Sequence, residues 1–189
     1  MERTTGADGA GVERLPGDVL RAVDDCLAEL DRRDFSRRLW SGDASLWPGD
    51  AGETSRRLGW LHVAETMPPH LEALRTLSAE SGTGSTPDAV LLGMGGSSLG
   101  AEVLNQAFGS AAGHPRLHVL DSTVPTAVGA VAEHIDIRHA LLIVSSKSGG
   151  TLEPNLLSEF FADMAAAETG RGAGGQCLAI TDPGTSLER

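Results

Sequence analysis

Cysteine and positive charge are both scarce in this sequence of 189 residues. Its two cysteines, Cys26 and Cys177, are too few and too far apart for a disulfide framework or a cysteine metal knuckle. Lys and Arg number 15 against 26 Asp and Glu, which gives a net charge of −11. Because nucleic acids and anionic membranes are bound by basic surfaces, general binding to either is excluded. An anionic small molecule stays compatible with this charge, since backbone N–H groups at a helix start bind anions locally.

Long apolar runs are also missing, and we expect no secretory signal in the first residues. No apolar run approaches the length that spans a bilayer, and the first fifteen residues lack the apolar centre of a secretory signal. The six histidines are scattered without the spacing of metal ligands. We therefore expect a cytoplasmic protein that neither enters a membrane nor holds a metal ion.

The N-terminal part of the sequence has the patterns of helices and turns. Residues 1–17 are expected to form a flexible lead-in. Apolar residues then recur at helical spacing and predict one helix from Asp18 to about Leu39. A second helix is expected to begin at Pro68-Pro69, because proline is tolerated in the first helical turn. The segment 81–88, rich in Gly, Ser and Thr, is typical of a linker.

After this linker, short apolar runs alternate with helical segments. The apolar runs are 89–92, 117–120, 140–144 and 177–180, and the helical segments are 98–108, 126–135 and 152–168. Apolar strands that alternate with helices predict a parallel sheet covered on both faces, and right-handed crossovers make it doubly wound. We therefore expect an α/β fold, a doubly wound parallel sheet over 87–189, preceded by an N-terminal helical segment over 1–86.

In such sheets ligands bind at the carboxyl ends of the strands. In this sequence the loop after the first predicted strand is rich in glycine. This loop, GMGGSSLG, spans 93–100. Its glycines permit a tight turn and a close approach of the backbone to a ligand, while amides at the following helix start face an anion. A dinucleotide-binding loop is one alternative, with Asp121 as the ribose-binding acid. Against it, Ser98 replaces the third glycine and Asp121 lies further along than usual. A glycine-rich turn without a ligand is the other alternative.

The loop after the third strand is rich in hydrogen-bond donors. It contains three hydroxyls, two glycines and one lysine: Ser146, Lys147, Ser148, Gly149, Gly150 and Thr151. The glycines let successive amides converge, and a helix that begins near Thr151 adds its positive end, a combination that suits a phosphate dianion. Lys147 either binds the phosphate through its charge or contributes only its amide. The spacing of a P-loop is absent, and helix capping explains one hydroxyl but not three.

The end of the sequence carries a helix-start pattern. Thr185 is followed three residues later by Glu188, which is the spacing of a capping box. Because a natural domain seldom stops in the first turn of a helix, we expect the α/β domain to be truncated at its C-terminal end.

The two loops together resemble those of the sugar isomerase (SIS) domain of glucose-6-phosphate isomerases, which has a flavodoxin-like fold. The segments LDSTVP, 120–125, and ITDPGTSLE, 180–188, fit the same family. Upstream, FSRRLWSGDASLW, 35–47, looks like the isomerase half of bacterial bifunctional transaldolase/glucose-6-phosphate isomerases. The resemblance extends from about Asp34 to the last residue.

The resemblance implies roles for both loops. The second loop would bind the phosphate of a hexose 6-phosphate through the hydroxyls and amides of the six residues named above. The first loop would lie close to the sugar, with Gly95, Gly96, Ser97 and Ser98 next to it. Gly150 and Pro154 stand where the family often has threonine, so we expect fewer hydroxyl contacts and a lower affinity than is typical.

The resemblance also implies a reaction, the interconversion of aldose and ketose 6-phosphates in glycolysis and gluconeogenesis. A general acid/base opens the sugar ring, and a carboxylate then moves a proton between C1 and C2 through an enediol, without a metal or organic cofactor. The family's catalytic Glu, His, Lys and Arg lie beyond the end of this chain, so we expect no catalytic residue in it. The full-length protein would be a homodimer. The alternative is a non-catalytic SIS-type module that binds or senses a phosphosugar.

Overall fold

The computed structural model describes residues 16–81, 86–170 and 175–188, which divide into two units between Pro69 and His70. Residues 1–15 of the predicted lead-in and 82–85 of the predicted linker lie outside these residues, while Ser81 ends a helix and Asp88 begins a strand. The helix after Pro69 groups with the second unit, although the sequence placed it in the N-terminal segment. The division into domains 1–86 and 87–189 stays a prediction. Within the described residues, no helix combines the length and the apolar character that crossing a membrane requires.

The first unit consists of short helices joined by turns. Its elements are α1 (Gly17–Arg32), α2 (Phe35–Trp40), η1 (Ala44–Leu46), α3 (Ala51–Arg56), η2 (Gly59–His62) and α4 (Val63–Thr66). The single helix predicted over 18–39 was wrong, because the chain breaks at Asp34, whose φ is 51°. Aspartate tolerates this left-handed conformation better than most residues. Its N–H donates to the carbonyl of Asp31 at 3.0 Å, and its carboxylate accepts from Arg37 of the next helix.

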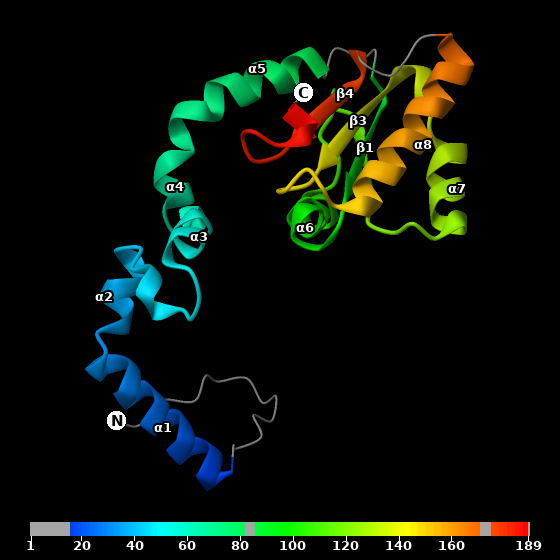
Figure 1. Ribbon diagram of the computed structural model, residues 1–189. Coiled ribbons are helices and arrows are strands. Elements are labelled where there is room, and N and C mark those ends of the chain that lie inside the picture. Colours follow the sequence, from blue (N-terminus) through cyan, green and yellow to red (C-terminus); the bar gives the residue numbers. More distant parts are fainter. Residues whose placement is uncertain (1–15, 82–85, 171–174, 189) are drawn as a thin grey trace. The chain divides into compact units, whose positions relative to one another are not determined.

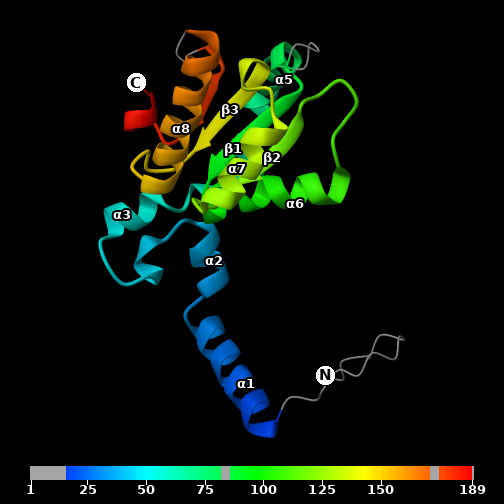
Figure 2. The same cartoon turned by 90° about the vertical axis from the view of Figure 1, so that its right-hand side faces the viewer.

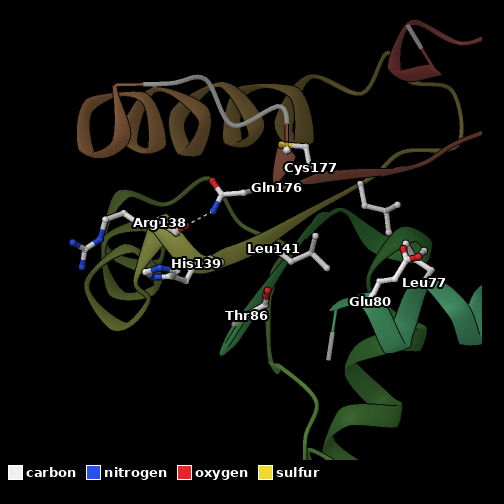
Figure 3. Close-up of a pocket in the computed structure, with 11 residues that line it drawn as sticks. Leu77, Glu80, Thr86, Arg138, His139, Leu141, Gln176 and Cys177 are labelled. Carbon is white, nitrogen blue, oxygen red and sulfur yellow. Dashed lines mark hydrogen bonds between the residues drawn. The ribbon is translucent and has the colours of Figure 1, made fainter. Parts of the chain in front are cut away.

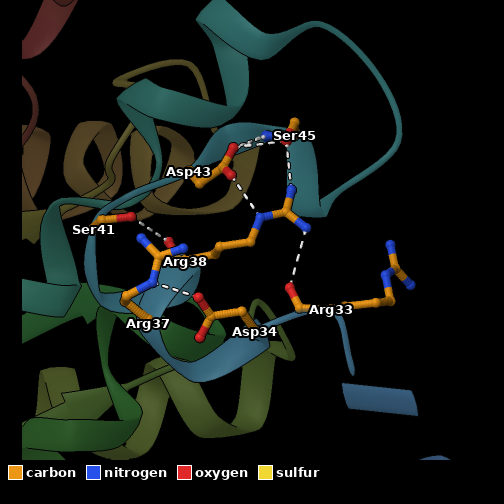
Figure 4. A network of polar contacts seen from close by, with 7 residues as sticks. All are labelled: Arg33, Asp34, Arg37, Arg38, Ser41, Asp43 and Ser45. Carbon is orange, nitrogen blue, oxygen red and sulfur yellow. Dashed lines mark hydrogen bonds and ion pairs between the residues drawn. The ribbon is translucent and has the colours of Figure 1, made fainter. Parts of the chain in front are cut away.

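A polar network holds the turn that follows α2 (Figure 4). The Nε of Arg38 donates to Asp43 at 2.8 Å, and a terminal nitrogen of the same guanidinium donates to the Ser45 hydroxyl at 2.8 Å. Asp43 also accepts from the Ser45 hydroxyl at 2.7 Å and from the Ser45 N–H at 3.0 Å. Hydrogen bonds from Ser45 and Arg38 stabilise the charged carboxylate and lower the pKa of Asp43 to about 2.

We predict that protonation of Asp43 weakens the first unit in acid. The pKa of its carboxyl is about 2 in the folded chain against the usual 3.8, so its contribution to stability is complete above about pH 4 and is lost as the pH falls towards 2. All three tryptophans, Trp40, Trp47 and Trp60, belong to this unit and the chain has no tyrosine, so fluorescence during urea unfolding follows this unit alone. The Asp43→Asn variant should be less stable at pH 7 and should converge with the parent by pH 2. An equal difference in the free energy of unfolding between parent and variant at pH 7 and at pH 2 would contradict the lowered pKa of Asp43.

The second unit is built on a parallel sheet. Within the described residues four strands pair in the order β2-β1-β3-β4: β1 (Asp88–Gly93), β2 (Arg116–Leu120), β3 (Ala140–Ser145) and β4 (Cys177–Ile180). The helices are α5 (Leu71–Ser81), α6 (Leu99–Phe108), α7 (Pro125–His134) and α8 (Leu152–Thr169). The 3₁₀ turns of this unit are η4 (Gly95–Ser97), η5 (Ile137–His139) and η7 (Ser186–Glu188), and η3 (Pro68–His70) spans the boundary between the units. The predicted α/β fold with a doubly wound parallel sheet is confirmed.

The strand order fixes where each helix lies. From β1 the chain moves to one side to reach β2, and it then returns past β1 to reach β3 and β4. Right-handed crossovers therefore place α6 on one face of the sheet and α7 and α8 on the other. Figures 1 and 2 show α7 and α8 together over one face, with α6 below and apart from them. The direction of winding reverses between β1 and β3, which is where ligands bind in open α/β sheets.

The core of this unit lies between the sheet and the helices α7 and α8. The strand side chains Val90, Leu92, Leu142 and Val144 point to this face and are at most 4% exposed. Phe161 of α8 packs against them and is 0% exposed. The neighbouring Phe160 is 46% exposed, and its ring meets that of Phe161 edge to face at a centroid distance of 5.1 Å.

We predict that these two phenylalanines differ sharply in their contribution to stability. Phe161→Ala should lower the free energy of unfolding by about 3–5 kcal/mol, because it leaves a cavity in the core. Phe160→Ala should cost less than about 1.5 kcal/mol, mainly the loss of the ring contact. Urea unfolding followed by far-ultraviolet circular dichroism provides the measurement. Equal losses at the two positions would show that the packing of α8 is described wrongly.

A buried carboxylate joins β1 to β2 at the amino ends of these strands. Asp88 is 2% exposed and accepts hydrogen bonds from Arg116 at 2.9 and 3.0 Å and from the Nε2 of His118 at 2.8 Å. Burial alone would raise the pKa of Asp88, but the hydrogen bonds from His118 and Arg116 outweigh it and lower the pKa below its usual value. The cluster fixes the register of the two strands, because a slip would leave this carboxylate buried without partners.

Candidate functional site

Both loops singled out in the sequence leave the sheet at its carboxyl edge, from neighbouring strands. The last residue of β1, Gly93, pairs in register with the last residue of β3, Ser145. A Cβ atom on Gly93 would lie 3.3 Å from the Cβ of Ser145 and 3.2 Å from the carbonyl oxygen of Ser97. The two loop stems are therefore packed against each other, and they begin where the sheet reverses its winding.

The first loop turns most of its predicted sugar-proximal residues outward. Gly95 and Gly96 are exposed, Ser97 is half-buried, and a Cβ atom on Gly96 would meet nothing within 4 Å. Gly95 has a φ of 54°, which favours glycine. Ser98 is instead 1% exposed, and its hydroxyl donates to the carbonyl of Gly95 at 3.2 Å. Ser98 thus holds the turn together from inside.

The second loop divides its three hydroxyls between inside and outside. Ser146 is 1% exposed, and its hydroxyl donates to Thr151 Oγ1 at 3.0 Å. Ser148 is exposed, and its oxygen accepts from the N–H of Gly150 at 3.2 Å. Lys147 is exposed, Gly149 is buried and Thr151 is half-buried. The loop therefore presents Lys147, Ser148, Gly150 and part of Thr151 to solvent, with Ser146 behind them.

Helix α8 begins at this loop with its first amides uncapped. Thr151 is the N-cap residue, yet its side chain accepts no hydrogen bond from the helix. The first N–H groups of a helix have no partner within it, so those of Leu152 and Glu153 are available to an anion, together with the positive end of the helix dipole. The third position is Pro154, which has no N–H to satisfy. Helix capping therefore does not account for Thr151.

The segment after β4 packs against the second loop, which the sequence analysis did not foresee. The hydroxyl of Ser186 and the side-chain amide of Asn155 donate to the carbonyl of Gly149 at 3.0 and 3.2 Å. The carbonyl of Lys147 accepts from the N–H of Asp182 at 3.1 Å. The one available signal was the position of the segment at the end of a strand, since all parallel strands end at the same edge.

The predicted helix start at Thr185 forms a short 3₁₀ turn, η7. The hydroxyl of Thr185 lies 2.7 Å from that of Thr181. The Glu188 carboxylate accepts from the N–H of Gly184, one residue before the position that a capping box uses.

A cavity of about 410 Å³ lies elsewhere in this unit (Figure 3). It is lined by residues of α5, such as Leu77, and by the first residues of β3 and β4, including Leu141 and Cys177. This is the amino end of the strands, so the cavity contains no residue of the two loops. Desolvation raises the pKa of the Cys177 thiol, which disfavours its reactive thiolate form. Across the described residues, no three His, Cys, Asp or Glu side chains come together as a metal site.

Comparison with known proteins connects this architecture to one family. The family model described as phosphoglucose isomerase matches residues 61–173, more than half of the chain. A glucose-6-phosphate isomerase of Thermus thermophilus is 31% identical over 132 residues, which cover 70% of this chain and 31% of that protein. A glucose-6-phosphate isomerase of a Synechococcus species is 32% identical over 112 residues, covering 58% and 21%.

Solved structures have the same fold. The crystal structure of a hypothetical protein from Thermus thermophilus superposes with a TM-score of 0.65 at 28% identity, covering 93% of this chain and 40% of that one. The crystal structure of a glucose-6-phosphate isomerase from Chlamydia trachomatis gives a TM-score of 0.55 at 26% identity, covering 80% and 28%. The chain thus spans about a third or less of the curated relatives named above, and the matched segment includes both loops. On this agreement of sequence and fold, the chain belongs to the phosphoglucose isomerase family.

Proposed function

We propose that this chain supplies the phosphate-binding part of a glucose-6-phosphate isomerase and that the loop over 146–151 binds the phosphate of a hexose 6-phosphate. The observation that carries the proposal is the pairing of Gly93 with Ser145, which starts both loops side by side at the reversal of the sheet. A ligand held by its phosphate at the second loop would extend its sugar over the open surface at Gly96.

The contacts of the second loop support a division of labour among its residues. Ser148 accepts from an amide and keeps its own O–H free to donate to a phosphate oxygen. Thr151 accepts from Ser146, which leaves the Thr151 proton free in the same way. Ser146 would orient Thr151 rather than touch the ligand. Lys147 adds either its charge or its amide, and the Gly150 amide holds the Ser148 oxygen in place.

The complete protein would interconvert glucose 6-phosphate and fructose 6-phosphate in the cytoplasm, as a homodimer and without a metal or organic cofactor. These 189 residues alone should bind phosphosugars and not isomerise them, because the resemblance implies none of the family's catalytic Glu, His, Lys or Arg among them. A non-catalytic phosphosugar-binding module is the alternative, and detection of isomerisation by the protein of which this chain is part would exclude it. A dinucleotide-binding loop is the other alternative, and against it stand Ser98 at the third glycine position and the late position of Asp121.

We predict that Ser148→Ala combined with Thr151→Ala weakens binding of fructose 6-phosphate. The loss should be about 1–3 kcal/mol, the scale of hydrogen bonds to a charged group. Isothermal titration calorimetry of the 189-residue chain measures it, with fructose as the ligand that lacks a phosphate. Thr76→Ala is the matched control, because Thr76 is an exposed threonine on α5 whose hydroxyl bonds only within its helix.

Two results would contradict the proposed function. One is an unchanged affinity in the double variant while the parent binds. The other is a parent whose melting temperature rises with NAD and not with fructose 6-phosphate, since a ligand that binds only the folded state must stabilise it.

A further inference from the structure

We propose that Ser186, on the turn after β4, is a positioning residue that sets the phosphate affinity of the 146–151 loop through the carbonyl of Gly149. The inference rests on the proposed function of that loop. It assigns a role to a segment that is distant in sequence and that the resemblance leaves without one.

The carbonyl oxygen of Gly149 is held from two sides. The Ser186 hydroxyl donates to it at 3.0 Å from η7, and the Asn155 side chain donates at 3.2 Å from α8. A carbonyl oxygen has two lone pairs, so these two donors satisfy it fully. The carbonyl is therefore fixed in a direction that points into the protein, towards η7 and α8.

The direction of this carbonyl decides the direction of the next amide. A trans peptide is planar, so the N–H of Gly150 points away from the carbonyl oxygen of Gly149. On that opposite side the N–H donates to the Ser148 oxygen at 3.2 Å. Ser186 thus determines, through one rigid peptide plane, where the Gly150 amide and the Ser148 hydroxyl face.

The backbone at Gly149 is also in close contact with the turn after β4. Its φ of 67° is left-handed, and a Cβ atom there would lie 2.8 Å from the Cβ of Thr185 and 3.2 Å from the Ser186 hydroxyl oxygen. The turn after β4 therefore lies directly against the glycine. Further bonds join the two segments, from the N–H of Ser146 to the carbonyl of Ile180 at 3.0 Å and from the N–H of Asp182 to the carbonyl of Lys147 at 3.1 Å.

We predict that Ser186→Ala weakens binding of fructose 6-phosphate about fivefold, the equivalent of one neutral hydrogen bond. Ser186→Thr should restore the parent affinity, because it returns the hydroxyl at an exposed position with room for a methyl group. The ¹H–¹⁵N resonance of Gly150 should shift in the alanine variant and return in the threonine variant. If Ser186 only stabilised the fold, Ser186→Ala would lower the melting temperature, but the affinity and the Gly150 resonance would not change in the alanine variant and return in the threonine variant.

A second variant keeps the test independent of η7. Asn155→Leu removes the other donor to the same carbonyl from α8, and it should weaken binding by a similar factor. If the parent binds and both variants bind as tightly as the parent, the positioning role is wrong while the proposed function stands. If the parent binds neither fructose 6-phosphate nor inorganic phosphate, the proposed function fails and the positioning role fails with it.

A matched pair of glycines tests the contact with Thr185. Gly149 and Gly170 have the same φ of 67°, but a Cβ atom on Gly170 would meet nothing within 4 Å. Both alanine variants carry the cost of a left-handed residue, and only Gly149→Ala also displaces the turn after β4. We expect Gly149→Ala to bind fructose 6-phosphate at least about tenfold more weakly and Gly170→Ala to bind as the parent does. Equal affinities in the two variants would show that the contact between Gly149 and the turn after β4 does not affect binding.

Discussion

The pairing of β1 with β3 is the constraint on which the rest of the second unit depends. Gly93 lies so close to Ser145 that a side chain on Gly93 would press on β3 and on Ser97 of the loop that follows β1. This approach joins two strands that are separated by more than forty residues in the chain, and it makes their loops start at one point. The reversal of the sheet then leaves the carboxyl ends of both strands open to a ligand. The site is thus a consequence of strand order before it is a consequence of any single side chain.

An acidic protein with a net charge of −11 can still hold an anion if the donors are local. Here they are hydroxyls, backbone amides and the uncapped start of α8, and Lys147 is the one residue of the 146–151 loop with a positive charge. Such donors act within one turn of the helix, whereas the charges of the distant surface are screened over a Debye length of about 8–10 Å.

The sequence predicted the strands and the helices of the α/β unit to within about one residue at most ends, because each apolar run is bounded by glycine, polar or proline residues. It failed at Asp34, where the apolar spacing continued but one left-handed residue broke the helix. A hydropathy pattern carries no information about the backbone angle of a single residue. The sequence also did not reveal that Ser146 and Ser98 point inward, because a serine in a glycine-rich loop looks the same in the sequence whether it binds a ligand or stabilises the turn.

The contact of Ser186 with the loop could not be predicted either, because it joins two segments that share no local sequence pattern. Strand order brings the turn after β4 to the same edge as the loop after β3, but the fit between Gly149 and Thr185 depends on the path of both backbones. The two departures from the family's threonines can be understood in the same terms. Gly150 gives up a hydroxyl, and its N–H donates to the Ser148 oxygen at 3.2 Å, while Pro154 gives up another hydroxyl and removes an N–H that would lack a partner at the helix start. The direction of the Ser148 hydroxyl thus depends on the Gly150 amide, and that amide is directed by the side chains that hold the carbonyl of Gly149.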